Sequence, residues 1–503
     1  VDGPVGVAGA GFLLSLRSGF TGLLASKNEA TYVRGETGDW LAKAEAPAFG
    51  GQLRVLGYDS ENEVDAAAAA EREVDPAPYA ARNTFEWHSR SFGAAWTGSF
   101  RGRTLRLQGW RAASDASAFW TRAPVALILG AKRRDEGALA ALEHSDARAT
   151  TVAGVRFERS RTSYDVGGYP ALIPWSASVR LPIVSGFLQH ARPIHSRLDL
   201  EVGASLAAAA GSVYPGPRAR LRWKPWGEST LSLSYARLHQ FAQSLRNPES
   251  VAGNIFPADL YLGAGAAAVP VGRSDQGVIA AEVRPWPGIR LGLQAYGRAL
   301  DGLVLVAPRQ GEPFATGGFA AGSGASRGLA IDLAASGTRY GVVASYGWQR
   351  VRLAYGDSSY VPDHGSTHVL EAGATVFPTA TSSIRLGIAG ALGRRTTAVA
   401  GAFEWESCNL LDQGCEFAGA PHASASPGTA TLPHYLRVDL GVRKHWDVEI
   451  GGRNAWVALF GTVTNVFARR NVLTYAEDPA SGERVLIEMR PRAPLVVGLD
   501  WQF

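Results

Sequence analysis

Hydrophobic and polar residues alternate along this chain in segments of about ten residues. At the C-terminus, Leu495, Leu499 and Trp501 share one parity, whereas Asp500 and Gln502 occupy the other. The same two-residue period recurs at residues 198–203, 231–236, 289–294, 384–389 and 436–443. Because successive side chains of a β-strand point to opposite faces, each segment predicts a strand with one apolar and one polar face.

The residues on the polar face of these segments are small or charged, and this face rarely carries a second set of apolar side chains. Soluble β-sandwiches seldom contain ten or more long strands of this kind, whereas a membrane barrel has lipid outside and water or a plug inside. Short connections lie at 224–227, 284–288 and 377–380, and long polar connections at about 59–82, 113–148, 241–273, 307–326, 393–434 and 476–486. This asymmetry between two rims predicts one all-β, antiparallel transmembrane barrel over residues 1–503, with short periplasmic turns and long extracellular loops.

The length predicts the size of the barrel. Between 18 and 20 strands can be assigned from the pattern, and residues 114–194 leave room for two more. A chain of 503 residues, at about 23 residues per strand and connection, accommodates about 22 strands. Trp226 and Trp286 recur in Pro-rich short turns, which predicts an interfacial aromatic girdle; ordinary packing is the alternative for each Trp alone.

Composition excludes several other classes of protein. The chain is 46% hydrophobic and 19% charged, which argues against disorder, and no run of about 18 apolar residues predicts a membrane helix. The net charge is only +5 and acidic residues are interspersed throughout, so a nucleic-acid partner is not expected. Lys occurs only at positions 27, 43, 132, 224 and 444, and all other basic residues are Arg. Codon composition explains this bias, although Arg also suits a surface that meets anionic headgroups.

The two cysteines, Cys408 and Cys415, lie close together in a polar, Gly-rich stretch. In an oxidising compartment this pair predicts a small loop disulfide, with two unpaired thiols as the alternative. The spacing does not fit a CxxC redox or zinc site. The chain begins at Val1 and its one Met is Met489, so we expect a processed or trimmed product.

Several segments, in order along the chain, resemble the barrel of TonB-dependent outer-membrane receptors. They include Pro257-Ala258-Asp259-Leu260-Tyr261, Val361-Pro362-Asp363-His364, Leu432-Pro433-His434-Tyr435 and Val463-Thr464-Asn465-Val466-Phe467, and the last strand, which ends in Trp501-Gln502-Phe503. The resemblance implies a bacterial outer-membrane receptor that takes up a scarce nutrient. Its implied partners are lipid and lipopolysaccharide, the TonB complex, the barrel-insertion machinery, which would recognise Trp501 and Phe503, and a small-molecule or peptide ligand.

The family's N-terminal plug of about 130 residues is not recognised in this sequence. A plug that is removed or supplied by another chain, and a plugless passive pore or structural barrel, therefore remain alternative expectations. Because a barrel of about 22 strands is too wide for its own side chains to fill, we expect a plug or plug chain in the lumen. Arg437, Asp439 and Arg443 are the predicted lumen charges, and we expect them to contact water or that plug.

No catalytic constellation, cofactor motif or metal site is expected. Asp59, Glu61, Glu63 and Asp65 form an acidic cluster, but their spacing matches no calcium-loop motif, and a solvated loop is favoured. His364 and His368 are four residues apart beside Pro362 and Gly365, which favour a loop over a metal-binding helix. Gly393-Arg394-Arg395 opens a long loop and is either an anion contact or an ordinary charged rim.

Overall fold

The computed structural model describes residues 2–4, 6, 9–20, 31–68, 82–122, 125–169, 175–244, 261–263, 269–306, 319–362, 365–396, 430–450, 453–477, 484–489 and 493–502. Within these ranges, no helix is long and apolar enough to cross a membrane. One antiparallel sheet of 22 strands dominates the fold, as the sequence predicts. Two of its strands, β1 (Asp2–Pro4) and β19 (Ser358–Tyr360), are only three residues long.

The other strands of this sheet pair in chain order from β2 to β28. The first eleven are β2 (Gly11–Phe20), β3 (Thr31–Ala48), β4 (Gly51–Ala68), β5 (Arg82–Phe100), β6 (Arg103–Arg122), β7 (Val125–Ser145), β8 (Thr150–Tyr169), β9 (Trp175–His195), β10 (Leu198–Ala209), β11 (Ser212–Trp223) and β12 (Thr230–Gln240). The remaining nine are β15 (Gly272–Val283), β16 (Ile289–Val306), β17 (Phe319–Ser336), β18 (Tyr340–Tyr355), β20 (His368–Thr379), β21 (Ser382–Leu392), β24 (Tyr435–Ile450), β25 (Arg453–Val463) and β28 (Leu495–Gln502).

Three small hairpins lie in the long connections and stand apart from the main sheet. They are β13 (Ala242–Ser244) with β14 (Tyr261–Gly263), β22 (Arg395–Thr396) with β23 (Ala430–Thr431), and β26 (Val472–Glu477) with β27 (Arg484–Glu488). All three belong to the rim that carries the long loops.

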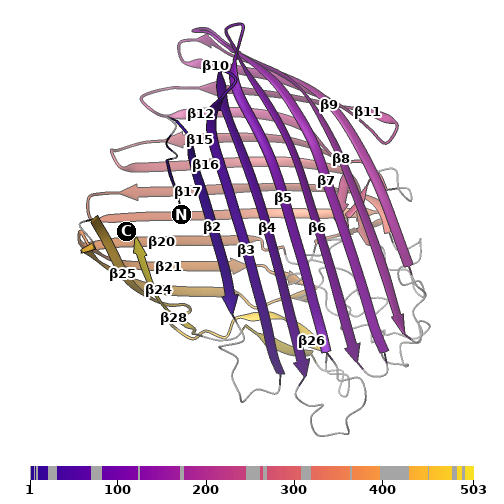
Figure 1. Cartoon of the computed structure of the whole chain (residues 1–503), viewed down its shortest axis with the longest axis vertical. Helices are drawn as coiled ribbons and strands as arrows, with labels where there is room; N and C mark the ends of the chain where they lie inside the picture. Colours follow the sequence, from indigo (N-terminus) through magenta and orange to yellow (C-terminus); the bar gives the residue numbers. More distant parts are fainter. Residues whose placement is uncertain are drawn as a thin grey trace.

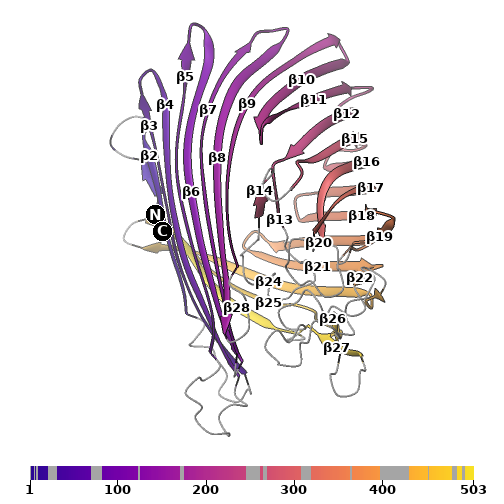
Figure 2. The same cartoon turned by 90° about the vertical axis from the view of Figure 1, so that its right-hand side faces the viewer.

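The sheet curls so that two walls face each other. Strands β2–β9 form a tall wall, and β12–β25 cross behind it in Figure 1 and form the opposite wall in Figure 2. Both views place the N- and C-termini side by side. At the rim where the connections are short, β3 and β4 are joined by Phe49 and Gly50, and β5 and β6 by Arg101 and Gly102. The six alternating segments named above lie in β10, β12, β16, β21, β24 and β28, which confirms the strand prediction.

Two predicted loops are wrong. The segment 113–148 is mostly the strand pair β6 and β7, and residues 59–68 of the segment 59–82 form the end of β4. The acidic cluster thus lies on β4 and not at a strand-to-loop junction. In these upper parts several outward positions are charged, among them Arg111, Asp115 and Arg134, so the hydrophobic alternation is interrupted although the hydrogen-bonded ladder continues. Hydrophobic alternation depends on contact with lipid, so it cannot reveal the part of a strand that extends beyond the membrane.

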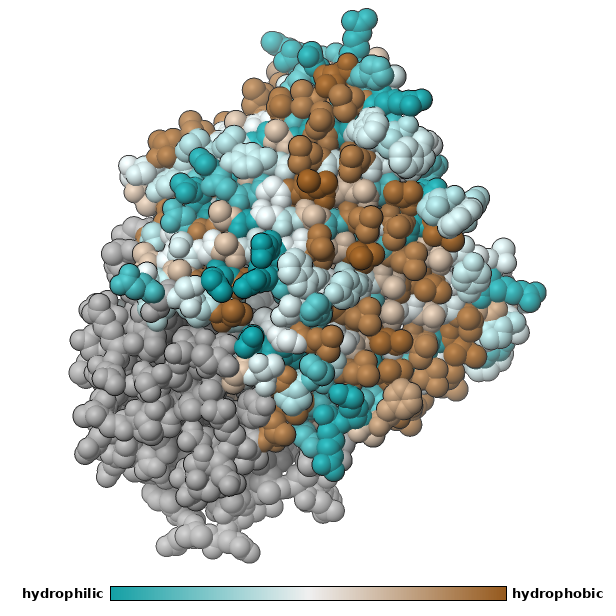
Figure 3. Space-filling model, turned by 180° about the vertical axis from the view of Figure 1, so that it is seen from behind, coloured by the Kyte–Doolittle hydropathy of each residue, from teal (hydrophilic) through white to brown (hydrophobic). Residues whose placement is uncertain are grey.

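The register separates an outer from an inner face. On β24 the outward side chains include Leu440 and Val442, which are 43% and 53% exposed, whereas Arg437, Asp439 and Arg443 have the opposite parity. Figure 3 shows hydrophobic side chains in a broad band across the rear of the molecule, with hydrophilic side chains toward its margins. An exposed hydrophobic surface of this size would be unusual in a soluble protein. It is typical of a barrel whose outer face contacts lipid.

The height of this band follows from β5. Its outward positions from Phe92 to Phe100 are Phe, Ala, Trp, Gly and Phe. Eight residues at about 3.4 Å each measure about 27 Å along the strand, and a tilt of about 40° reduces this to about 21 Å of height. This is close to the apolar band of about 25 Å that is typical of outer-membrane barrels.

Candidate functional site

The inner wall of the barrel carries charges that are paired within the wall. On β24, Arg437 Nε lies 3.0 Å from Asp439 Oδ2, and Arg443 reaches Asp500 of β28 at 3.0 Å. Asp439 also accepts a hydrogen bond of 2.9 Å from the backbone N–H of Asn465. Although the sequence predicts that these charges contact water or a plug, the wall itself supplies a partner for each of them.

A hollow of about 1200 Å³ lies against this inner wall, between the short turn after β15 and strand β25. Its floor is made mainly of small residues on β17–β24, among them Ala334, Gly341, Gly373, Gly387 and Gly441. Cross-strand pairs such as Gly373 with Gly387 place these small residues opposite one another. The inner surface of the wall therefore carries small side chains over a wide area, and it leaves the lumen open.

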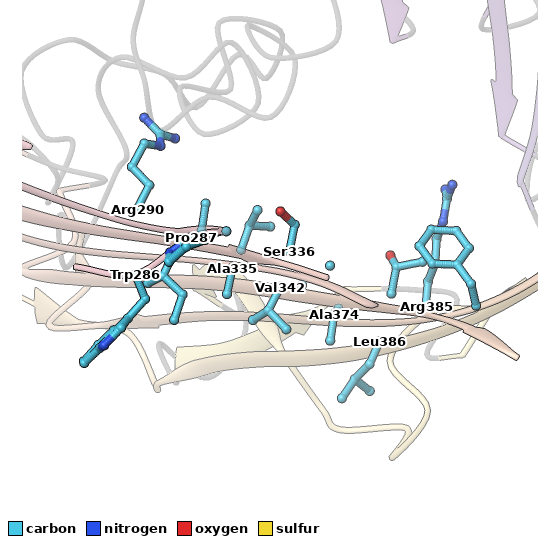
Figure 4. A pocket seen from close by; sticks show the side chains of 18 of the residues that line it. Trp286, Pro287, Arg290, Ala335, Ser336, Val342, Ala374, Arg385 and Leu386 are labelled. Atoms are coloured by element: carbon cyan, nitrogen blue, oxygen red, sulfur yellow. The ribbon is translucent and has the colours of Figure 1, made fainter. Parts of the chain in front are cut away.

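Two arginines stand above this smooth floor. In Figure 4, Arg290 of β16 and Arg385 of β21 point into the hollow, whereas Trp286 and Leu386 point away from it toward the outer side. Arg290 lies 3.7 Å from Glu282, a long and weak contact. In the described part of the chain, Arg385 has no ion-pair partner. The hollow thus offers positive charge to whatever occupies it.

Two glycines of the barrel define how much room each face offers. A Cβ atom added to Gly341, on the inner face, would meet nothing within 4 Å, and the same holds for Gly461, on the outer face. Gly341 pairs with Thr375, which is next to Arg385 in the inner-face register, while Gly461 pairs with the exposed Val442 and Val497. The two positions form a matched pair on opposite faces.

The base of the long loops is tightly bonded. The Arg394 guanidinium donates hydrogen bonds to the backbone carbonyls of Pro433 (3.4 Å), Val472 (2.8 Å) and Leu473 (3.5 Å). Burial lowers the pKa of Arg394, although an Arg side chain keeps its charge. Arg394 joins three loop segments and is half-buried. It therefore stabilises the base of the loops and is poorly placed to bind an anion.

Two asparagines complete this loop base. Buried Asn471 bonds the backbone of Leu436 in both directions, accepting at 3.1 Å and donating at 2.9 Å. Asn465, with a φ of 50°, donates to the Arg469 carbonyl at 2.9 Å, so the Asn-Val-Phe element forms a left-handed turn against β24. Alternation could not reveal these roles, because both side chains act on backbone groups outside the alternating segments, four residues away for Asn465 and 35 residues away for Asn471.

The other predicted site residues are spread over the molecule. Trp226 and Trp286 lie in short turns at the same rim and are 65% and 66% exposed. Trp501 faces outward with Leu495 and Leu499. Cys408, Cys415, His364 and Phe503 lie outside the described residues, so the disulfide and the terminal Phe stay predictions.

Asp59 of the acidic cluster has two basic partners. The Asp59 carboxylate is bonded to His88 at 3.0 Å and to Arg90 at 2.9 Å, so it already has cationic neighbours. His368 bonds Tyr346 at 2.7 Å. Within the ranges that the structure describes, no group of three His, Cys, Asp or Glu side chains is placed to hold a metal ion.

Comparison with solved structures identifies the fold. The pyoverdine outer-membrane receptor FpvA from Pseudomonas aeruginosa PAO1 matches with a TM-score of 0.68 and 10% identity, over 100% of this chain and 75% of that chain. The ferric citrate transporter FecA matches with a TM-score of 0.65 and 12% identity, over 100% of this chain and 74% of that chain. The chain has the fold of a TonB-dependent receptor barrel.

The ferric yersiniabactin uptake receptor FyuA from Yersinia pestis has the same TonB-dependent receptor barrel, with a TM-score of 0.67 and 10% identity over 99% of this chain and 76% of that chain. No protein-family model matches the sequence, and no curated protein matches it. This barrel fold belongs to proteins that span the bacterial outer membrane, which agrees with the apolar outer band described above. At about one residue in ten identical, the likeness lies in the fold and not in the side chains.

Proposed function

We propose that this chain is the barrel of a bacterial outer-membrane receptor that imports a scarce nutrient, with a plug in its lumen and energy supplied through TonB. The observation that carries this proposal is the smooth inner wall, with its hollow of about 1200 Å³ beside Arg290 and Arg385. A wall of small residues, on which Arg437, Asp439 and Arg443 are paired with one another or with Asp500, has little left to fill the lumen. A packed plug with carboxylates facing these two arginines fits the space.

The proposed nutrient class is an iron chelate. The compared structures are named as receptors or transporters for pyoverdine, ferric citrate and ferric yersiniabactin. Small, anionic chelates of this kind also suit a lumen whose inner hollow presents Arg290 and Arg385. The first substrates to test are therefore ferric complexes of carboxylate and hydroxamate chelators.

The matched glycines give the experiment. Gly341→Trp places an indole into the proposed plug space, whereas Gly461→Trp places the same indole into lipid. Both variants and the native protein are expressed in a strain lacking the gene, and uptake of radioactive iron is measured for each chelate. We expect Gly341→Trp to abolish energy-dependent uptake and Gly461→Trp to retain it. Equal uptake by both variants would contradict a plug that packs against this wall.

A passive pore is the other outcome. The native protein, isolated with whatever fills its lumen, is incorporated into planar bilayers and its conductance is recorded. We expect a closed barrel with small or no steady conductance. A large, permanently open pore would replace the receptor proposal with the passive one, because a lumen this wide conducts freely when nothing occupies it.

A further inference from the structure

The hairpin of β10 and β11 is much shorter than the strand beside it. Each of its strands has 12 residues, whereas β9 has 21. Twelve residues at about 3.4 Å each, tilted by about 40°, reach a height of about 31 Å, which is only about 6 Å more than an apolar band of about 25 Å. The rim of the barrel therefore lies at the level of the lipid headgroups here.

This hairpin is also uncharged in its upper half. No charged residue occurs from Val202 to Pro217, on either face of the wall. Its outer face is apolar from the short turn to the tip. The outward residues are Leu198, Leu200, Val202, Ala204, Leu206 and Ala208 of β10 and Val213, Pro215, Pro217, Ala219, Leu221 and Trp223 of β11. An acyl chain in the outer leaflet can therefore follow this face up to the rim.

The hydrogen-bonded ladder is interrupted between β11 and β12. β10 and β11 share twelve register pairs and β12 and β15 share eleven, but β11 and β12 share only six, of which the uppermost is Arg218 with Ala236. Above it, Ser212–Pro217 of β11 and Arg237–Gln240 of β12, all of them described residues, continue as strands without pairing with each other. We call these two segments the seam. It begins about 16 Å above Trp223, at the short-turn end of β11, and ends near the headgroups.

The sequence of β11 accounts for this interruption. Pro215 and Pro217 have no N–H to donate, and Pro within a sheet is confined to edges and bulges. The Gly216 carbonyl accepts a hydrogen bond of 3.4 Å from the Ser205 hydroxyl, inside the hairpin. An unpaired backbone donor in lipid is strongly unfavourable, so the lack of two donors lowers the cost of an unpaired edge. The sequence therefore favours an open ladder at this height.

Three aromatic rings lie across the seam. The ring of Tyr214 on β11 is 5.4 Å from the ring of His239 on β12 and 5.3 Å from the ring of Phe241, which follows β12. The rings of His239 and Phe241 are 6.4 Å apart. Side chains change rotamer within nanoseconds, whereas a continuous ladder would have to break several hydrogen bonds to open. The seam is closed by side chains that can move apart, so it can open while the rest of the barrel stays folded.

Cations line the inner face of β11 directly below the seam. Arg218, Arg220 and Arg222 have lumen parity, and Arg218 donates a hydrogen bond of 2.6 Å to the Gln189 side chain. Arg220 and Arg222 border a hollow of about 310 Å³, and within the described chain neither has an ion-pair partner. A guanidinium group binds a carboxylate or phosphate through two parallel hydrogen bonds. An anionic group that passes the seam therefore reaches cations.

The carboxylates that border this hollow have partners of their own. Asp199 is paired with Lys224 at 2.8 Å, and Glu201 accepts a hydrogen bond of 2.6 Å from Gln189. Asp146 accepts hydrogen bonds from two backbone N–H groups of its own turn. Arg220 and Arg222 thus remain available to an anion from outside the wall.

A molecule with an acyl chain and an anionic head fits these features together. A single acyl chain holds a small molecule at a membrane reversibly, so such a ligand is concentrated at the height of the seam. Across the seam, Arg237 is paired with Asp275 at 2.7 Å, which places charged groups beside a polar head at this level. We propose that the barrel admits an iron chelate that carries an acyl chain, and that this chelate enters the lumen sideways, between β11 and β12. The proposal rests on the iron uptake given under the proposed function and adds the acyl chain and the route.

The route is tested by linking the two sides of the seam. The variant Tyr214→Cys/His239→Cys is joined by a short bifunctional thiol reagent with a cleavable link, and every protein in the test carries Cys408→Ser and Cys415→Ser. Uptake of radioactive iron is measured, in a strain lacking the gene, for one carboxylate–hydroxamate chelator that bears either a dodecanoyl or an acetyl group. We expect the linked protein to lose uptake of the dodecanoyl chelate and to keep uptake of the acetyl chelate, which enters from above.

Two controls accompany this variant. The same protein before linking, and again after the link is cleaved, should import both chelates, which shows that it is folded. Ala207→Cys/Tyr214→Cys loses the same Tyr but links register partners of β10 and β11, which are already paired, so both chelates should enter. Equal uptake of both chelates by the linked seam variant would overturn lateral entry. Loss of both would show that the link blocks the lumen and would also reject a separate lateral route.

A second measurement does not depend on iron uptake. The full chain is reconstituted in lipid vesicles with N-dodecanoyl aspartate that carries a photoreactive group beside its carboxylates, and labelled residues are mapped by mass spectrometry after illumination. We expect label on Arg218, Arg220 and Arg222 in the unlinked protein and its loss when the seam is linked. Equal labelling in both states would overturn the lateral route.

The two measurements separate the two proposals. Uptake of neither chelate by the native protein, together with labelling that depends on the open seam, would remove the proposed iron import and leave lateral entry standing. Uptake of both chelates whether or not the seam is linked, together with equal labelling, would leave the receptor standing and remove the lateral route.

Discussion

Replacing neighbouring residues on β21 tests which face of the barrel meets lipid. Leu386 faces outward and is 42% exposed, whereas Gly387 faces inward, opposite Asp439. In Leu386→Arg a guanidinium enters the apolar band. In Gly387→Arg the same group enters the lumen beside a carboxylate, and a Cβ there makes only ordinary contact, 3.6 Å from the Asp439 Cβ.

The magnitude follows from the depth of Leu386. It lies four residues from Ser382 at the short-turn end of β21 and six from Leu392 at the other end. At about 3.4 Å per residue and a tilt of about 40°, these distances are about 10 Å and 16 Å of height, which puts the side chain near the middle of the band. An Arg at that depth costs about 2–4 kcal/mol, and a lumen Arg opposite Asp439 costs less than about 1 kcal/mol.

The assay is reversible unfolding of each variant by guanidinium chloride in lipid vesicles, followed by Trp fluorescence. We expect the free energy of unfolding to fall by about 2–4 kcal/mol for Leu386→Arg and to change little for Gly387→Arg. Leu386→Gln serves as a neutral control for the lost hydrophobic side chain. Equal losses for the two Arg variants, or a larger loss for Gly387→Arg, would refute the assignment of faces.

Two further predictions concern the loop rim. Buried Gln243 donates hydrogen bonds to the carbonyls of Pro270 and Gly302 and accepts one from the N–H of Val304. Gln243→Ala should therefore lower the free energy of unfolding by about 2–3 kcal/mol and speed proteolysis near β13, and unchanged proteolysis would show that these bonds do not hold the hairpin. Cys408 and Cys415 should form a disulfide that contributes about 2.5 kcal/mol by the loop-entropy model, and reduction should raise the intact mass by about 2 Da; two thiols in the unreduced protein would contradict it.

The sequence predicts the part of the fold that lies in lipid. Segments such as 384–389 alternate because one face meets acyl chains and the other does not, and each of them is a strand of the barrel. Above the lipid this cause disappears, so the pattern predicts a loop at 113–148 where the structure has the upper parts of β6 and β7. Parity alone places Arg385 on the polar face, but only the structure shows that it borders a hollow.

The alignment of three arginines in one outward row of β7, β8 and β9 could not be found from the sequence. Arg134, Arg161 and Arg180 lie on three strands, and they meet only because the register brings them into one row. A shift of one residue in either pairing would turn one member toward the lumen. Register over strands of about 20 residues depends on the whole ladder, so local patterns do not determine it.

The wall of the barrel steps down where β9 meets β10. The ladder between them ends at the pair Ala209 with Ile183, and β10 turns back through Ala210 and Gly211, whose φ angles are 48° and 76°. Beyond Ile183 the upper part of β9, toward Trp175, is hydrogen-bonded to β8 on its other side. An edge of this kind is where two copies of a protein add strands to one another and aggregate. Here the first residue past the step is Pro182, which has no N–H to donate, and the next outward residue is charged Arg180. The step therefore lowers the rim on one side of the mouth, while Pro182 and Arg180 disfavour strand pairing between neighbouring copies of the chain in a crowded membrane.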